Sequence, residues 1–293
     1  MMIEEFLNYL RYERNCSALT VQGYEGDLRD FEAFFGKLEA QLSWDTIDSD
    51  IIRDWMESMM NKGNTATSVN RRLSALRSFY RFALSHHKVT SDPVHGITGP
   101  KKIKLLPQFL KEKEMDQLLS DEQWDDSYKD VRARTIILTF YSTGMRLSEL
   151  VGLNDGAVDF LTGEIKVTGK RNKQRIIPFG KELAGALRAY MEKRDKEVAR
   201  QSEATFLTEK GERMTQQQVR DEVKKNISKV SALKKRTPHV LRHTFATAML
   251  NHEAGLESVK KLLGHESLMT TEIYTHTTFE QLKRVYRKAH PRT

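Results

Sequence analysis

Cysteine is almost absent from this chain, since Cys16 is the only one among 293 residues. A single cysteine excludes an internal disulfide framework and a zinc site built from several cysteines. A lone cysteine beside helix-forming residues is typical of an inert packing residue. We therefore assign no function to Cys16.

Long apolar runs are also missing, and none approaches the length that a membrane-spanning helix needs. The N-terminal stretch MMIEEFLNYLRYER is too acidic for a secretory signal. Hydrophobic residues make up 39% of the chain and charged residues 30%, which is typical of a globular protein. We expect a cytoplasmic protein without a membrane partner. The sequence contains no P-loop and no acidic cluster of the nuclease type, so we also expect no cofactor and no metal.

Negative net charge is lacking too, because the chain carries a formal charge of +8. Clustered Lys and Arg side chains gain affinity for polyanions by releasing counterions from phosphates. The charge alone is only an indication of a nucleic-acid partner, since many basic proteins bind nothing acidic. The length allows two ordinary domains, each with its own core.

The first part of the chain, up to about residue 87, has helical periodicity that fits four helices, with starts near Thr20, Asp50 and Thr67. The last of these helices has an apolar stripe of Val69, Leu73, Leu76, Phe79, Tyr80 and Ala83. Its other side carries Arg71, Arg72, Arg77 and Arg81. This basic face is either a surface for DNA or simply a solvated face of the bundle.

Proline, glycine and lysine interrupt the helical pattern near residue 100 and indicate an interdomain linker. We place the first domain at residues 1–98, the linker at 99–107 and the second domain at 108–293. In the second domain a helix is predicted from Tyr128 to Ser142, ended by a left-handed Gly144. The alternation between Val158 and Pro178 predicts a three-stranded antiparallel ribbon. The rest is again helical, so the fold class is mainly α with a small antiparallel β-ribbon (α+β).

Four polar segments follow one another in the second domain: YSTGMRLSELVGL, KVTGKRNKQRIIPF, TPHVLRHTFATAML and VKKLLGHESLMTTEIYTH. They bring arginines, histidines and a tyrosine into one region. Positive hydrogen-bond donors and an in-line nucleophile suit attack on a phosphodiester. In this order, the segments resemble the active-site boxes of the tyrosine recombinases, and most closely those of the Xer branch. The resemblance implies a helical core-binding domain and a catalytic domain that close as a clamp around DNA.

The resemblance also implies roles for six residues. Arg146 and Arg242 are the two arginines that bind the scissile phosphate, His239 and His265 are its histidine partners, Lys170 is the general acid, and Tyr274 is the nucleophile. His239 is in addition a candidate for the base that accepts the tyrosine proton. Glu149 is expected to orient the catalytic groups rather than to act as a base, because a free carboxylate would repel the phosphate.

Each of these residues has a simpler interpretation when it is taken alone. Arg146 is then a surface arginine paired with Glu149, and Lys170 is part of a basic hairpin that binds backbone phosphates, together with the neighbouring Arg171, Lys173 and Arg175. His239 and His243 have a spacing that suits a metal, although no other ligands complete the shell. His265 is then a capping or core histidine, and Tyr274 a core residue.

The predicted function is site-specific recombination, through a 3′-phosphotyrosyl link and a Holliday junction formed by four protomers on a double-stranded DNA site. The partner protomer is the same chain or a paralogue, and a DNA translocase is a further candidate partner. The ending KAHPR also resembles that of Xer proteins, and this resemblance favours resolution of chromosome or plasmid dimers. An integrase or invertase of a mobile element, a type IB topoisomerase and a non-catalytic architectural protein are the alternatives. The amphipathic tail folds back on its own domain or, by the resemblance, packs into a neighbouring protomer.

Overall fold

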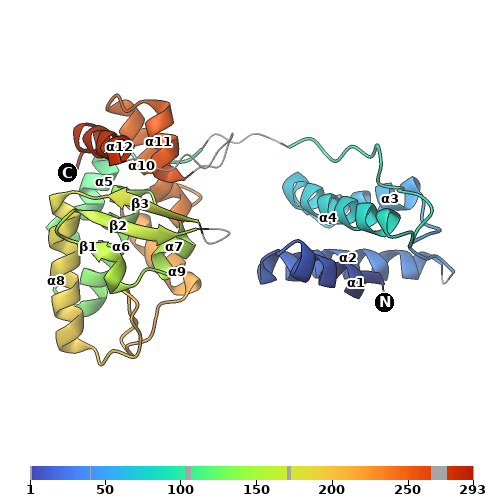
Figure 1. Ribbon diagram of the computed structural model, residues 1–293, viewed down its shortest axis with the longest axis horizontal. Coiled ribbons are helices and arrows are strands. Elements are labelled where there is room, and N and C mark those ends of the chain that lie inside the picture. Colours follow the sequence, from blue (N-terminus) through green and yellow to red (C-terminus); the bar gives the residue numbers. More distant parts are fainter. Residues whose placement is uncertain (1, 40, 103–106, 170–172, 265–275, 293) are drawn as a thin grey trace. The chain divides into compact units, whose positions relative to one another are not determined.

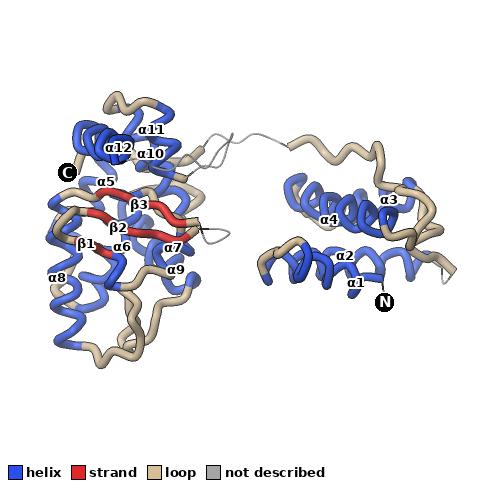
Figure 2. The backbone as a smooth tube through the Cα atoms, in the orientation of Figure 1, coloured by secondary structure: helices blue, strands red, loops and turns tan. Residues whose placement is uncertain are grey.

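The computed structural model describes residues 2–39, 41–102, 107–169, 173–264 and 276–292. Its contacts divide the chain into two compact units, Met1–Leu105 and Leu106–Thr293. Both units are mainly helical, and the described residues contain one small antiparallel sheet (Figures 1 and 2). The predicted fold class is thus confirmed. Within the described ranges, no helix has the length and apolar character needed to cross a membrane.

The described part of the first unit contains the four predicted helices. The π-helical turn Tyr9–Glu13 lies between the first helix and the second. They are α1 (Met2–Asn8), α2 (Ala18–Leu38), α3 (Ser49–Asn61) and α4 (Ala66–Ser85). The last three begin one or two residues before the predicted starts, because a side-chain oxygen just upstream accepts a hydrogen bond from the first turn. These capping residues are Ser17, Asp48 and Thr65.

Aromatic side chains fill the core of the first unit. Phe31 packs against Trp55 and Trp44, with ring centroids 4.7 and 5.7 Å apart, and Trp44 packs against Phe79 at 4.4 Å. The buried Tyr80 hydroxyl donates to the Trp44 carbonyl over 3.0 Å, so its polar atom is satisfied. All six residues of the predicted apolar stripe on α4 are buried, which confirms that stripe.

The second unit is built around α6 (Tyr128–Thr143), which is buried along most of its length. Neighbouring helices pack against it: α8 (Lys181–Glu197), α9 (Gln216–Val230) and α10 (Pro238–Asn251). A helix enclosed on all sides needs no polar face, and α6 accordingly carries hydrophobic or hydroxyl side chains all round its C-terminal half. It ends as predicted, at Gly144 in the left-handed conformation.

The sheet consists of β1 (Val158–Asp159), β2 (Glu164–Thr168) and β3 (Gln174–Pro178), in the order β1-β2-β3 and antiparallel throughout. Figure 2 shows the three strands side by side, among the helices of this unit. The predicted three-stranded ribbon is confirmed. Its first turn contains Gly163, whose φ of +68° favours glycine. The second turn contains residues 170–172, which lie outside the described residues.

The remaining helices of the second unit are α5 (Glu112–Leu119), α7 (Leu147–Val151), α11 (Leu256–Leu263) and α12 (His276–Ala289). The C-terminal α12 lies against α10 and α11 of its own unit (Figure 1). Leu282 and Tyr286 are buried there in a cluster with Phe245 and Met249. In this single chain the tail therefore takes the first of its two expected positions, and insertion into a neighbouring protomer stays a prediction.

Candidate active site

Arg146 is placed by the sharp end of α6. Gly144 has a φ of +58°, and a Cβ there would lie 2.4 Å from a Phe245 ring carbon and 2.9 Å from Leu263 Cδ2. Only glycine fits a left-handed turn packed this closely. Two residues later, Arg146 is the extended residue that caps α7, and its backbone N–H donates to Glu149 Oε2 over 2.6 Å. The chain thus turns abruptly and presents Arg146 half-buried.

The carboxylate of Glu149 is fully buried and holds two arginines. Arg146 Nη1 donates to Oε1 over 3.0 Å, and Arg175 donates to both oxygens, with an Nη2 to Oε2 distance of 2.9 Å. Burial acts to raise the pKa of Glu149, but the hydrogen bonds and charges of Arg175 and then Arg146 outweigh it and hold the pKa below its usual value. Glu149 is therefore ionised and orients the guanidinium groups, as its expected role requires.

Three guanidinium groups meet at the C-terminal end of α11. Arg175 Nε donates to the carbonyl of Leu262 over 3.2 Å, Arg242 Nη2 to that of Leu263 over 2.7 Å, and Arg146 Nη2 to that of Gly264 over 2.8 Å. The last carbonyls of a helix have no partner within the helix and carry its negative dipole end, so cations are favoured there. Gly264 itself caps α11 with a φ of +64°.

Arg242 is the most deeply placed of these arginines, with 8% of its surface exposed. Its Nη1 donates to the carbonyl of Gly144 over 2.5 Å, so its two outer nitrogens connect the end of α6 with the end of α11. Burial, then the positive charges of Arg146 and Arg175, lower the pKa of Arg242 to about 10. The group is still a cation at neutral pH, and its charge is concentrated in a small, poorly solvated space.

His239 is the second residue of α10, after Pro238. Desolvation, and then the charges of His243 and Arg242 together with Arg220 and Arg146, lower the pKa of His239. The structure thus brings His239 within electrostatic reach of both predicted phosphate-binding arginines. A neutral imidazole at pH 7 can accept a proton.

A metal bound by His239 and His243 would need further ligands. Among the residues that the structure describes, no group of three or more His, Cys, Asp or Glu side chains is arranged to hold a metal ion.

Lys170, His265 and Tyr274 lie outside the described residues, and only their chain neighbours can be placed. Lys170 follows Gly169, whose backbone N–H donates to the Lys173 carbonyl over 2.7 Å across the base of the hairpin. His265 follows Gly264, at the point where the three arginines converge. Gly169, the last described residue before Lys170, lies next to Glu149. Gly264, the last described residue before His265, accepts a hydrogen bond from Arg146.

Three other tyrosines of this unit are poor candidates for a nucleophile. Tyr141, Tyr190 and Tyr286 are buried, and burial is the main cause that raises the pKa of each, in the case of Tyr141 to about 12. A phenol that is inaccessible and harder to ionise does not suit attack on a DNA phosphate.

Arg175 is a part of this cluster that sequence reasoning missed, because we counted it only among the basic residues of the hairpin turn. A signal was present in the alternation of β3. Alternate residues of a strand point to the same face of the sheet. Ile177 is fully buried and Ile176 is 44% exposed, so Arg175 lies on the inner face with Ile177. A buried arginine needs a carboxylate partner, and Glu149 is that partner.

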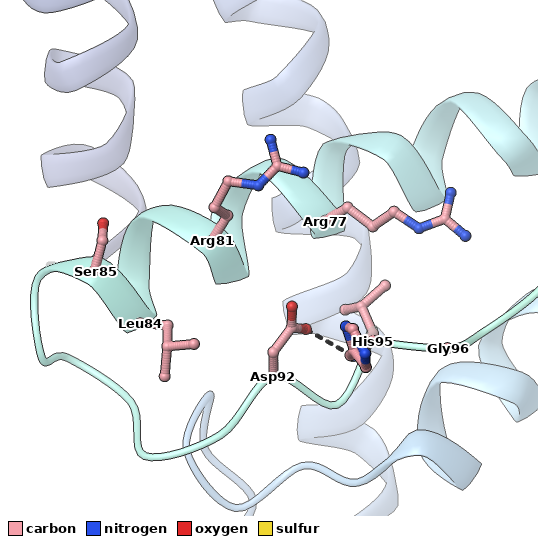
Figure 3. A pocket seen from close by; sticks show the side chains of 8 residues that line it. Arg77, Arg81, Leu84, Ser85, Asp92, His95 and Gly96 are labelled. Carbon is pink, nitrogen blue, oxygen red and sulfur yellow. Dashed lines mark hydrogen bonds between the residues drawn. The ribbon is translucent and has the colours of Figure 1, made fainter.

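In the first unit, the basic side of α4 divides into two parts. Arg71 forms a two-pronged ion pair with the buried Asp27 of α2, and Arg72 pairs with Asp30, so these arginines connect the two helices. Further along, Arg77 and Arg81 line an open cavity of about 440 Å³. Figure 3 shows both arginines on α4, and Asp92 and His95 on the loop that follows the helix; all four residues line the cavity.

A helical unit followed by a larger α+β unit with a cluster of arginines matches the arrangement expected of the tyrosine recombinases, a class of enzyme that acts on DNA strands. The family model "Phage integrase family" matches residues 108–281, and "Phage integrase, N-terminal SAM-like domain" matches residues 3–87. The chain belongs to the phage integrase family of tyrosine recombinases and is a site-specific DNA recombinase of the Xer type.

Curated relatives match along nearly the whole chain. The tyrosine recombinase XerC of Pelotomaculum thermopropionicum is 39% identical over 99% of this chain and 98% of its own length. XerC of Chlorobaculum tepidum is 38% identical over 98% of this chain and 94% of its own. The crystal structure of XerA recombinase covers 100% of this chain and 99% of its own at 27% identity, with a TM-score of 0.50.

XerH, solved with a palindromic difH substrate after cleavage, covers 96% of this chain and 83% of its own at 24% identity. Its TM-score is 0.72, and the likeness shows the shared fold.

Proposed function

We propose that this chain cuts and rejoins DNA with Tyr274 as the nucleophile and with Arg146 and Arg242 as ligands of the scissile phosphate. The observation that carries the proposal is the pair of hydrogen bonds from these two guanidiniums to consecutive carbonyls, Leu263 and Gly264. Arginines from two separate elements thereby share one small site, and planar guanidinium donors match the oxygens of a phosphate. The chain continues from that point directly into the segment with His265 and Tyr274.

The other assigned residues fit this chemistry. A neutral His239 accepts the tyrosine proton, His265 donates to a non-bridging oxygen, and Lys170 protonates the leaving 5′ oxygen. The tyrosine oxygen forms a bond to phosphorus while the bond to the 5′ oxygen breaks, which leaves a 3′-phosphotyrosyl link and a free 5′ hydroxyl. The link conserves the bond energy, so rejoining to another strand requires no ATP.

The biological role that we infer is resolution of chromosome or plasmid dimers in the cytoplasm, as part of chromosome partition at cell division. Two protomers on each duplex, from this chain alone or with a paralogue, would exchange strands through a Holliday junction, and a DNA translocase would activate the assembly. The names of the curated relatives support the Xer assignment. The complex of XerH with a palindromic difH substrate supports a DNA recombination site as the partner.

We assign residues 1–98 to a core-binding domain, 99–107 to the linker and 108–293 to the catalytic domain with its exchange helix. In the first domain, Arg81 is the arginine we expect at a backbone phosphate, because Arg71 and Arg72 are used in ion pairs with α2 and Arg77 donates to the carbonyl of Ile97.

The test is the formation of a covalent adduct. Nicked duplexes that carry sites selected from random DNA by binding to this chain are incubated with the wild type and with Tyr274→Phe, in EDTA and without ATP. We expect a denaturation-resistant protein–DNA adduct only with the wild type, and nearly equal DNA affinity for both proteins. An adduct with both proteins would place the nucleophile elsewhere. Tight binding without an adduct from the wild type would contradict the proposed chemistry.

A further inference from the structure

Arg175 joins three parts of the second unit through a single side chain. It belongs to β3, its outer nitrogens donate to both oxygens of Glu149, and its Nε donates to the carbonyl of Leu262 at the end of α11. Only 11% of the side chain is exposed, so its charge is compensated by Glu149 rather than by water. Its Cδ also lies 3.0 Å from the position that a Cβ on Gly264 would take, which makes this a close packing contact.

These contacts hold the ends of the two strands between which Lys170 lies in the sequence. Arg175 pairs with Val167 across the β2–β3 ladder, and the ladder runs on to the pair formed by Thr168 and Gln174. Gly169, the residue before Lys170, lies next to the same carboxylate, since a Cβ on it would be 3.5 Å from Glu149 Oε1. The base of the hairpin therefore lies against the carboxylate that also holds Arg146.

We propose that Arg175 is a positioning residue for Lys170: it fixes the strands that lead to the lysine, at Gly169 and Gln174, to Glu149 and to α11. The point from which the chain continues into Lys170 is thereby held next to the carboxylate that also binds Arg146. Arg175 acts through protein contacts in this proposal, because its nitrogens donate to Glu149 and Leu262 and only 11% of its side chain is exposed. The inference rests on the proposed function, in which Lys170 supplies the proton to the 5′ oxygen.

The chemistry of the leaving group provides a specific test. An alkoxide is a poor leaving group and needs a proton from a general acid, whereas a thiolate, because of its much lower pKa, leaves without one. A substrate with sulfur in place of the 5′ bridging oxygen therefore bypasses the general acid. The ratio of cleavage rates, sulfur substrate over oxygen substrate, rises when the general acid is lost or misplaced. This ratio does not depend on the fraction of folded protein.

We would measure this ratio for the wild type, Lys170→Ala, Arg175→Gln and Arg175→Lys, by single-turnover adduct formation. Arg175→Gln should slow cleavage of the oxygen substrate by about 10- to 100-fold, the usual effect of removing a residue that orients a reactive group. Its rate ratio should rise as that of Lys170→Ala does, and Arg175→Lys should restore it in part. Adding Arg175→Gln to Lys170→Ala should leave the ratio unchanged, because both act on one step.

Arg194→Gln is the matched control. Arg194 is 1% exposed, forms a two-pronged ion pair with Asp155 and donates to the carbonyl of Thr205, so its bonding resembles that of Arg175, but it lies on α8 and pairs with a different carboxylate. Its loss should lower the melting temperature and leave the rate ratio at the wild-type value. A wild-type ratio for Arg175→Gln would overturn the proposal even if cleavage is slow. An unchanged ratio for Lys170→Ala would instead refute Lys170 as the general acid, and the role of Arg175 with it.

Discussion

The Nε2 nitrogen of His290 donates a hydrogen bond to the backbone carbonyl of Tyr141 over 3.1 Å, and this bond fixes the end of α12 to α6. The Nδ1 nitrogen accepts from the backbone N–H of Arg292, so both ring nitrogens have partners. The ring is 3% exposed and stacks on Tyr286, with centroids 5.1 Å apart. The C-terminal helix is thus attached to its own domain through a buried histidine.

This histidine should make the stability of the second domain sensitive to acid. Burial, the first cause, lowers the pKa of His290 from 6.5 to about 4. The folded state therefore stays neutral where the unfolded state already takes up a proton, and stability is lost as the pH falls from 6.5 towards 4. The loss should be about 3 kcal/mol at most, from 1.36 kcal/mol per pKa unit. Urea unfolding of the wild type and His290→Gln across this range measures it. Equal pH slopes for the two proteins would refute the attachment.

Gly144→Ala should damage both the fold and the site. The methyl group would meet Phe245 and Leu263 at less than 3 Å, and the residue would keep a positive φ that alanine disfavours. We expect a loss of about 2 to 4 kcal/mol in unfolding free energy, the combined cost of strain and overpacking. Adduct formation should fall as well, because the Gly144 carbonyl accepts from Arg242.

Gly185→Ala provides the control for this substitution. Gly185 lies on the exposed side of α8, and nothing lies within 4 Å of a Cβ placed there. Alanine should stabilise the helix by about 0.5 to 1 kcal/mol and leave cleavage unchanged. The two variants are compared by their thermal unfolding and their adduct yield. If Gly144→Ala had the stability and the adduct yield of the wild type, the steric argument would be refuted.

Sequence patterns predicted the elements of this fold because those patterns are local. The apolar stripe on α4, the left-handed glycine after α6, and the alternation of the β-ribbon each depend on residues that are close in sequence. The four boxes also predicted six residues of the active site. Of these, Arg146, His239 and Arg242 are brought together, while Lys170, His265 and Tyr274 lie outside the described residues.

Contacts between distant residues could not be predicted in this way. Arg175 pairs with Glu149 across 26 positions of sequence, and Arg71 pairs with Asp27 across 44. In a sequence, both arginines count equally as positive charge, although one supports the site and the other connects two helices. Only the packing of the elements distinguishes a structural arginine from one available to DNA.

This distinction predicts different results for two arginines on α4. Arg81 is exposed and lines the cavity of Figure 3, so Arg81→Gln should weaken DNA binding and reduce the slope of log affinity against log salt by about one. Its melting temperature should equal that of the wild type. Arg71→Gln should instead lower the melting temperature, because the buried Asp27 loses its two-pronged partner. Binding titrations at several salt concentrations distinguish the two; an unchanged slope for Arg81→Gln would exclude this arginine from the DNA interface.

The lowered pKa of His239 predicts the pH profile of cleavage. Desolvation and nearby positive charge, first that of His243 and then that of Arg242, place its pKa below 6.5, so the ring is neutral and able to accept the tyrosine proton at pH 7. The pH dependence of the second-order rate constant for adduct formation reports the pKa values of groups in the free enzyme. This rate constant should not change with pH near neutrality and should fall as the pH drops below 6.5. His239→Gln cannot take up the proton, so its rate should be low, by about 100-fold or more, and should lose this acid limb. An acid limb that persists unchanged in His239→Gln would assign the base to another group. A limb that disappears while DNA affinity stays constant would identify His239 as the proton acceptor, because a histidine that only bound phosphate would bind more tightly when protonated at low pH.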